Sequence, residues 1–221
     1  MKKITTAAVT AVALSVVLVG CSPTTEKNST ATEQSTPAEQ SVEARPEGAT
    51  LHQYIVDNKI AEVPFKKGEA GTPTVDFPFP PGWRGAGDLT PDWAYGAIIY
   101  DKAVDANDPP FMYAIGSKLT GDIDPQKVLE LAPAQLNELP GFKAIGEPER
   151  DTLSGFDAID YVGTYELDGK TRAVGQQTIV IPGEDSLFVL QLNAEAPAGQ
   201  EQVVIDAANL IADQTKITLP S

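Results

Sequence analysis

Three long, consecutive strand patterns in the C-terminal half constrain the fold of this chain more than any other feature. They cover Phe156–Leu167, Thr171–Ile181 and Ser186–Ala194. Asp168-Gly169, between the first two, is typical of a tight hairpin turn, and Pro182–Asp185 forms a longer connection. Because strands joined by short turns pair antiparallel, the sequence predicts a mainly antiparallel sheet.

Further strand patterns precede these three. Asp92–Tyr100 carries apolar residues on both of its faces, which predicts a central strand. Phe111–Leu119 follows after the turn at Asn107–Pro110, and we expect it to pair with Asp92–Tyr100. Pro78 and Pro80 indicate that the strand containing them lies at a sheet edge. Shorter strands are expected at Thr74–Phe79 and Arg150–Leu153.

Helix signals occur before, between and after the strands. Thr50 begins a capping box for a helix to Asn58, and Asp124-Pro125 is a strong helix start. Pro133 should kink or split that second helix before Pro140-Gly141 ends it. A last helix is expected over Gln200–Gln214. Since both sheet faces carry apolar residues, helices should cover both, which predicts the α+β class and a single α/β/α sandwich.

The N-terminus has the features of an export signal. Two lysines precede an uncharged apolar run from Ile4 to Val19, which is short for a membrane-spanning helix. The run ends in Leu18-Val19-Gly20-Cys21, which resembles a bacterial lipobox. We therefore expect residues 1–20 to be a signal peptide, and the Cys21 thiol to receive a diacylglyceryl group. The acylated cysteine, with palmitate among its chains, would anchor the protein on the extracytoplasmic side of the cell membrane.

A polar segment separates Cys21 from the apolar patterns. Residues 21–48 are rich in Ser, Thr, Pro and Glu, and Val42 is their only aliphatic residue larger than Ala. Such a segment cannot bury enough apolar surface to fold, so we expect a disordered tether with a reach of about 30 Å. A plain solvated tether is favoured over one that carries sugar on its threonines. One globular domain is then expected over residues 49–221.

Composition excludes several kinds of function. The chain has 31 acidic and 16 basic residues, a net charge of −15, which argues against nucleic acid as a partner. One cysteine excludes an internal disulfide and a thiolate zinc site, and one histidine excludes a two-histidine metal site. No cofactor or metal is expected.

Catalytic patterns are also missing. No serine lies in a G-x-S-x-G motif, and Gly82–Gly87 lacks the spacing of a dinucleotide-binding loop. His52 could act as a base, but its place in the first helical turn favours a surface role. Carboxylate pairs at Asp122/Asp124 or Asp157/Asp160 could serve a hydrolase, although acids beside turns are usually solvated. We expect a protein that is not an enzyme.

The aromatic residues allow two interpretations. Trp83 and Trp93 lie near Tyr95 among prolines and glycines. Tryptophans most often pack in the core. Alternatively, these three residues line a groove at one sheet edge for an acyl chain, a sugar or a partner segment.

Taken together, the folded part resembles the LpqN/LpqT lipoproteins of mycobacteria and their relatives. The resemblance spans about residues 50–218 and rests, in order, on His52–Ile60, Gly71–Pro78, Pro80–Trp83, Trp93–Ile98, Ser117–Gly121, Thr152–Phe156, Val180–Gly183 and Leu190–Ala194. It implies a PsbP-like sandwich and an actinobacterial cell envelope with mycolic acids. It also implies envelope lipid handling beside MmpL-type transporters, with trehalose mycolates as cargo, and no catalytic residues.

Three functions follow for testing. The first is a non-enzymatic binding or adaptor lipoprotein that contacts an envelope lipid, a glycolipid or a membrane transporter. The second is a structural accessory subunit of a membrane protein complex, by analogy of fold alone. The third, and least favoured, is an envelope hydrolase that uses two carboxylates.

Overall fold

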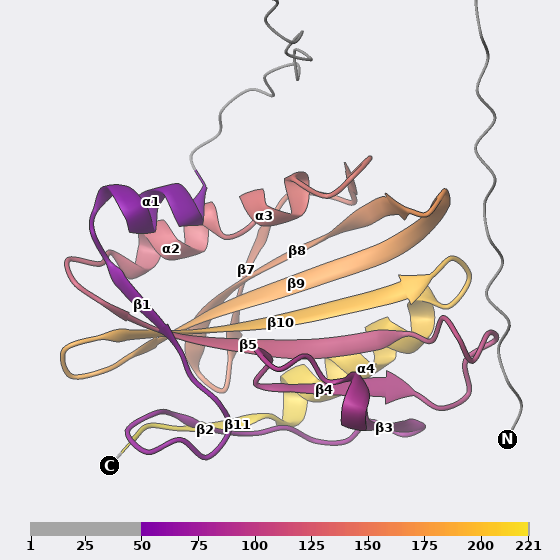
Figure 1. Cartoon of the computed structure of the whole chain (residues 1–221), viewed down its shortest axis with the longest axis horizontal. Helices are drawn as coiled ribbons and strands as arrows, with labels where there is room; N and C mark the ends of the chain where they lie inside the picture. The colour runs from indigo at the N-terminus through magenta and orange to yellow at the C-terminus, as the bar shows by residue number, and fades with distance from the viewer. Residues whose placement is uncertain (1–49, 221) are drawn as a thin grey trace, which may run out of the picture. The chain divides into compact units, whose positions relative to one another are not determined.

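The structure, a computed structural model, describes residues 50–220, and the signal peptide, Cys21 and tether predictions lie outside this range. Nine strands within it form one antiparallel sheet in the order β3-β4-β5-β10-β9-β8-β6, with β1 beside β5 and β7 beside β8 (Figure 1). The strands are β1 (Ala61–Pro64), β3 (Trp83–Gly85), β4 (Gly96–Tyr100), β5 (Phe111–Thr120), β6 (Lys143–Ala144), β7 (Glu149–Leu153), β8 (Phe156–Leu167), β9 (Lys170–Pro182) and β10 (Leu187–Pro197). A separate two-stranded sheet pairs β2 (Thr74–Asp76) with β11 (Lys216–Thr218).

The long hairpins confirm the prediction from the C-terminal half. β8 and β9 pair from Leu167↔Lys170 at the turn to Ala158↔Ile179. Asp168 has a φ of 51° and Gly169 a φ of 73°, the left-handed conformations that a tight hairpin needs. β10 then pairs with both β9 and β5, so these four strands form the continuous centre of the sheet.

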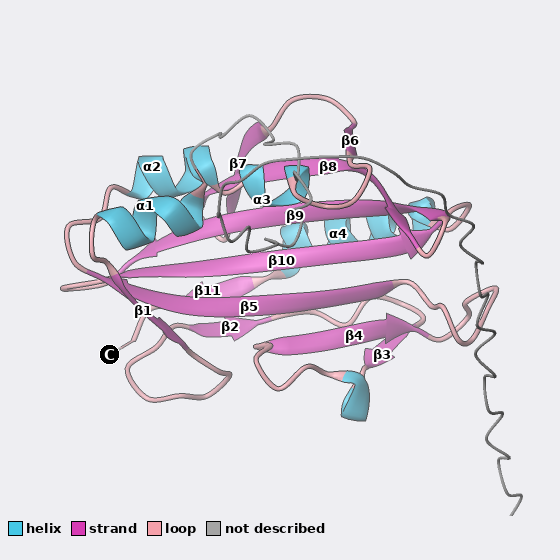
Figure 2. Ribbon diagram, turned by 45° about the horizontal axis from the view of Figure 1, so that its top comes forward, coloured by secondary structure: helices cyan, strands magenta, loops and turns pink. Residues whose placement is uncertain are grey.

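Helices cover both faces of this sheet, as the sequence predicted (Figures 1 and 2). The helices α1 (Leu51–Asp57), α2 (Pro125–Leu131) and α3 (Ala134–Asn137) lie on one face. The helix α4 (Glu201–Gln214) lies on the other, together with the β2/β11 sheet. We call these the α1 face and the α4 face. No helix among the described residues is long and apolar enough to span a membrane.

Each face buries its own apolar core. On the α1 face, Ile55 and Val128 pack against Ile159, Val180 and other strand residues. On the α4 face, one cluster surrounds Phe65, Phe188 and Leu190, and a second joins Met112 to Ala207 and Ile211 of α4. The alternation of side chains along the strands thus places two cores back to back.

Local sequence signals explain the helix boundaries. The Thr50 side chain accepts a hydrogen bond from the Gln53 backbone nitrogen at 3.1 Å, and that of Asp124 accepts one from Gln126 at 2.9 Å. These bonds satisfy donors that a helix start leaves free. Pro133 separates α2 from α3, as predicted.

Two strand predictions need correction. The strand expected at Asp92–Tyr100 begins only at Gly96, and it lies next to the edge rather than in the centre, because only the three-residue β3 flanks it. The strand expected at Thr74–Phe79 is shorter, as β2, and it belongs to the separate sheet. The short strands β1, β3, β6 and β11 lack a clear sequence pattern and were not predicted.

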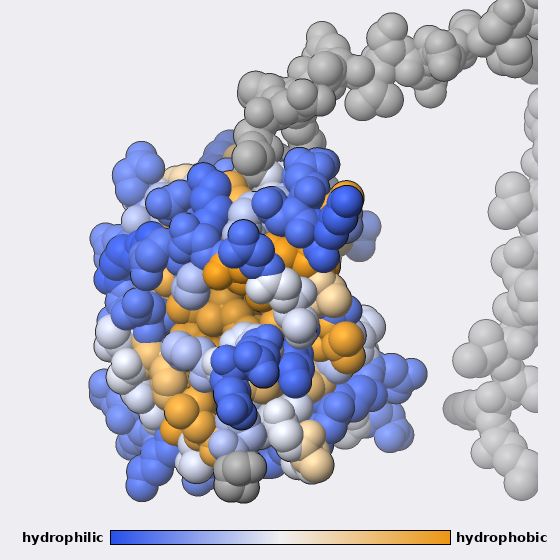
Figure 3. Space-filling view, turned by 90° about the vertical axis from the view of Figure 1, so that its left-hand side faces the viewer, coloured by the Kyte–Doolittle hydropathy of each residue, from blue (hydrophilic) through white to orange (hydrophobic). Residues whose placement is uncertain are grey.

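At one end of the sheet, near α1 and β1, apolar side chains reach the surface among hydrophilic ones (Figure 3). Val63 of β1 and Leu219, beyond β11, are both exposed. An open hollow of about 560 Å³ is lined by residues of the β9–β10 turn together with Lys118, Phe188 and Leu219. Its lining also includes Glu184 and Asp185, so charged and apolar groups are mixed there.

Candidate functional site

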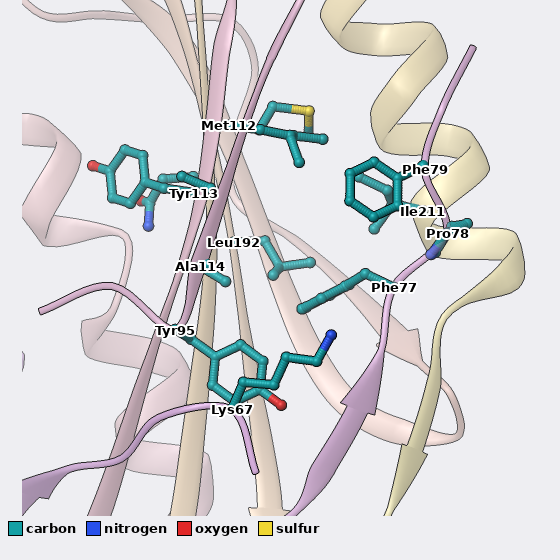
Figure 4. Close-up of a pocket in the computed structure, with 14 residues that line it drawn as sticks. Lys67, Phe77, Pro78, Phe79, Tyr95, Met112, Tyr113, Ala114, Leu192 and Ile211 are labelled. Carbon is teal, nitrogen blue, oxygen red and sulfur yellow. The ribbon is translucent and has the colours of Figure 1, made fainter. Parts of the chain in front are cut away.

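An apolar cavity of about 150 Å³ lies on the α4 face (Figure 4). Its walls come from segments that are distant in the sequence: the stretch after β2, the start of β4, the first half of β5, the middle of β10 and the end of α4. The residues that line it are Lys67, Phe77, Pro78, Phe79, Tyr95, Gly96, Ala97, Ile98, Met112, Tyr113, Ala114, Leu192, Asn193 and Ile211.

One wall is the sheet itself. Met112 and Ala114 of β5 project toward α4, and Leu192 of β10 pairs directly with Ala114 in the strand register. Tyr113 lies between Met112 and Ala114 in the sequence, and its ring therefore lies on the opposite side of the strand (Figure 4). This wall consists of hydrocarbon and thioether groups.

The opposing wall is an extended segment, Phe77–Pro81, which we call the strap. Pro78, Pro80 and Pro81 fix their own φ angles and restrict the residues before them to extended conformations. The Phe77 ring meets the Tyr95 ring edge to face, with 6.2 Å between centroids. Phe79 also lines the cavity, yet 67% of its surface is exposed. The strap therefore encloses the cavity incompletely.

Tyr95 holds the strap in place. Its hydroxyl oxygen accepts a hydrogen bond from the backbone nitrogen of Val75 in β2 at 3.2 Å. Its ring also contacts Phe65 edge to face at 5.8 Å. Burial raises the pKa of Tyr95, so the phenol stays neutral at physiological pH. The residue joins β2 and the strap to the buried core.

Lys67 provides the only charged side chain in the lining. It lies in the turn between β1 and β2, and its side chain extends along the Tyr95 ring toward Phe77 (Figure 4). The cavity is thus an apolar space with one ammonium group beside it.

This composition supports binding rather than catalysis. The residues around the cavity include no carboxylate, imidazole or thiol, and Lys67 and the tyrosines are their only titratable groups. No group of His, Cys, Asp and Glu residues in the described part of the chain could hold a metal ion. An apolar ligand fits the site best.

The structure separates the three aromatic residues of the predicted groove. Tyr95 lines the cavity. Trp83 is buried in the core with Met112 and Ile211 and does not line it. Trp93 is 52% exposed, and its ring contacts Tyr113 edge to face at 5.6 Å, away from the cavity. The three residues therefore do not line one common groove.

Sequence reasoning missed the residues that form most of the cavity. The strap carries a visible signal, the alternation Phe77-Pro78-Phe79-Pro80, which exposes phenylalanines on a stiff segment. Met112, Leu192 and Ile211 resemble any other core residue in the sequence. Only the tertiary fold distinguishes them.

None of the other residues considered for chemistry lines the cavity. His52 is exposed in α1, and Asp122 and Asp124 are exposed beside α2. Asp157 accepts a hydrogen bond from Gln126 at 3.3 Å. The carboxylates that raise the pKa of Asp160 are Asp151 and, to a smaller extent, Glu149, and Asp157 is not among them.

Comparison with known proteins gives consistent matches over the whole described domain. The family described as "Probable lipoprotein LpqN" matches residues 47–218. Lipoprotein LpqN of Mycobacterium tuberculosis (strain ATCC 25618 / H37Rv) is 46% identical over 227 residues, which cover 96% of this chain and 98% of LpqN. The crystal structure of LpqN, described as involved in cell envelope biogenesis of Mycobacterium tuberculosis, matches with a TM-score of 0.74 and 47% identity. That match covers 78% of this chain and 99% of the crystallised one. On these matches, and with the fold described above, the chain belongs to the LpqN family of lipoproteins.

Proposed function

We propose that this protein is a lipid-anchored, non-enzymatic envelope protein that binds the hydrocarbon chain of an envelope lipid in the cavity on the α4 face. The observation that carries the proposal is the cavity itself, which is apolar, partly open and lined by no carboxylate, imidazole or thiol. The role of the related LpqN in cell envelope biogenesis supports an envelope ligand.

The size of the cavity limits how much of a ligand it can hold. A cavity of about 150 Å³ accommodates a benzene-sized group, or roughly six carbon atoms. Each buried methylene contributes about 0.8 kcal/mol, which is about fourfold in affinity. A long acyl chain would enter with one end, and the rest of the molecule would lie outside.

The N-terminal features fit this role. Under the proposal, Cys21 carries diacylglyceryl and palmitate groups, and residues 21–48 tether the domain on the extracytoplasmic side of the cell membrane. A domain with 26 acidic and 12 basic residues from Gly48 onward is repelled by anionic head groups, so the acyl anchor supplies the attachment. A tether of this length lets the cavity reach lipids within about 30 Å.

The cargo and partner follow from the resemblance to the LpqN/LpqT lipoproteins. We propose trehalose mycolates as the lipid and an MmpL-type transporter as the membrane partner, on a PsbP-like fold. The alternative, an accessory subunit of a membrane complex, requires no ligand in the cavity. Ligand binding therefore separates the two.

A chain-length series tests the proposal. Residues 45–221 form one compact unit, and the crystallised LpqN chain corresponds to this domain alone, so the isolated domain is a suitable sample. Calorimetry would measure binding of alkyl glucosides with four to ten carbons, each below its micelle concentration. Affinity should rise about fourfold per carbon and level off near six carbons.

Matched variants locate the binding site. Leu192→Trp would fill the cavity and should abolish binding, whereas Ile115→Trp, on the opposite side of β5, should leave it intact. Thermal unfolding would confirm that both variants fold. Absence of binding, or equal loss in the two variants, would contradict the proposal.

A further inference from the structure

The geometry points to a ligand class beyond neutral glycolipids: we propose that the cavity prefers an amphiphile with an anionic head group, a carboxylate or a phosphate ester, which the ammonium of Lys67 binds. The inference rests on the proposed function, because it assumes that the hydrocarbon part of the ligand enters the cavity. It adds the charge of the group that stays at the entrance.

The position of Lys67 is determined by a turn rather than by a flexible loop. Gly68 has a φ of +79°, which a glycine adopts readily at the third position of a turn over residues 66–69. Lys66 and Glu69 close that turn twice, by a backbone hydrogen bond of 3.2 Å and by a bond from the Lys66 nitrogen to the Glu69 carboxylate of 3.1 Å. The Thr72 hydroxyl donates to the Glu69 carbonyl at 2.7 Å.

The same hydrogen bonds occupy the Glu69 carboxylate, which therefore does not pair with Lys67. Within the described part of the chain, the Lys67 ammonium forms no ion pair or hydrogen bond. Among the other cations, Arg84 pairs with Asp101, Lys127 with Glu130, and Lys118 lies over the Phe188 ring. Lysines such as Lys59 and Lys102 also form no ion pair within the described residues, but they do not line the cavity.

Lys67 stands out on this strongly acidic domain because it combines an unpaired charge with a place in the cavity lining. Most of the surface repels an anion, so an anionic head group gains most where a cation is unopposed. The apolar strap and sheet beside Lys67 lower the local dielectric and strengthen that attraction. An anionic amphiphile can then satisfy both parts of the site, with its chain against Met112 and Leu192 and its head group on Lys67.

A neutral head group gains less from Lys67. The ammonium can donate hydrogen bonds to sugar hydroxyls, but a carboxylate or phosphate adds charge–charge attraction to such bonds. A glycolipid would therefore be held mainly by its chain. This difference between head groups makes the inference testable without altering the cavity.

The experiment compares three ligands of equal chain length: decanoate, decyl phosphate and decyl glucoside, each below its micelle concentration. Binding to the domain of residues 45–221 is measured by calorimetry at low salt and again in 0.5 M NaCl, a concentration at which charge attraction is strongly screened, as the Debye length falls to roughly 4 Å. At low salt, both anions should bind about three- to fivefold more tightly than the glucoside, the range expected for a partly exposed ion pair. High salt should remove the difference.

Variants assign the effect to one side chain. Lys67→Gln should remove the preference for both anions over the glucoside, and Lys67→Glu should reverse it, so the readout is the ratio of anion to glucoside affinity in each variant. Lys66→Gln is the matched control, because Lys66 is exposed and does not line the cavity. Both positions are on the surface, so the variants should fold with wild-type melting temperatures.

The outcomes distinguish this inference from the proposed function. If only one of the anions binds more tightly, the head group is assigned to that chemistry, carboxylate or phosphate. If all three ligands bind equally, or if Lys66→Gln has the same effect as Lys67→Gln, the inference is overturned and hydrocarbon binding stands. If no ligand binds, the proposed function itself fails.

Discussion

The Tyr95 hydroxyl accepts a hydrogen bond from the Val75 backbone nitrogen at 3.2 Å, across 20 positions of sequence. Both residues are buried, and Val75 is completely inaccessible. Together with the contact between the Phe77 and Tyr95 rings, this bond connects β2 and the strap to the segment that leads into β4. It therefore helps to hold one wall of the cavity.

Tyr95→Phe should therefore loosen the strap. It leaves the buried Val75 nitrogen without an acceptor, which costs about 1–3 kcal/mol of unfolding free energy. Urea denaturation would measure the loss, and hydrogen exchange of the Val75 amide would locate it. Unchanged stability together with a protected Val75 amide would show that the bond does not contribute to the unfolding free energy.

Gly116→Ala should destabilise the α4-face core. The Phe65 ring lies so close that an added Cβ would be 2.7 Å from its Cζ atom, and a ring wedged among Tyr95 and Phe188 cannot move easily. Overpacking of this kind costs about 1–3 kcal/mol. Gly85→Ala is the control, since nothing lies within 4 Å of its added Cβ. Similar melting temperatures for the two variants would contradict the prediction.

Asp160→Asn should stabilise the protein at neutral pH. Burial, followed by the nearby carboxylate of Asp151, raises the pKa of Asp160 to about 6. The folded state thus holds this proton more tightly than the unfolded state, whose pKa is about 3.9. Stability from this group is present below about pH 4 and is lost as pH rises through about 6.

The measurement compares urea denaturation of wild type and Asp160→Asn at pH 4 and pH 7.5. We expect a gain of about 1 kcal/mol at pH 7.5, kept small because the group is partly exposed and screened, and a smaller gain at pH 4. Asp151→Asn should act in the same direction. A difference in unfolding free energy between variant and wild type that does not change with pH would contradict the raised pKa of Asp160.

Arg172→Ala should cost about 3 kcal/mol of unfolding free energy. The guanidinium is buried on the α1 face, where it pairs with Asp108, and its Nε lies 3.7 Å from a Glu195 oxygen. Tyr165 donates to the same Glu195 oxygen at 2.7 Å. Without Arg172, two partly buried carboxylates lose their cation, so denaturation experiments should show a larger loss than for Arg84→Ala, whose ion pair is exposed.

Cys21→Ser should release the protein from the membrane. Serine cannot receive the thioether-linked diacylglyceryl group, so the variant should move from the membrane fraction to the soluble or uncleaved precursor pool. Fractionation and the intact mass of the purified chain would show both effects. A variant that remains membrane-bound after cleavage would contradict the anchor.

The hairpins were predictable from the sequence because their rules are local. Asp168-Gly169 specifies a tight turn, and the flanking alternation places each end of β8 and β9 to within one residue. The helices α1 and α2 were predictable for the same reason, from Thr50 and Asp124. Neighbouring residues carry that information.

The cavity was not predictable, because it depends on long-range pairing. β2 meets β11 across about 140 positions, and neither strand has enough residues to show an alternating pattern. Trp93 and Tyr95 are two positions apart, so sequence proximity suggested one site. The chain turns between them: Trp93 faces Tyr113 and the solvent, whereas Tyr95 turns into the core.

The β2/β11 pairing can form only after the rest of the domain has been synthesised. β11 follows every other element of the domain, its Ile217 nitrogen donates to the Ser154 hydroxyl at 3.0 Å, and its partner β2 leads directly into the strap. A chain that has emerged only as far as α4 therefore has all the strands of the main sheet but lacks the strand that pairs with β2, next to the strap. If the cavity binds a hydrocarbon chain as proposed, removal of β11 should weaken that binding although the main sheet stays complete.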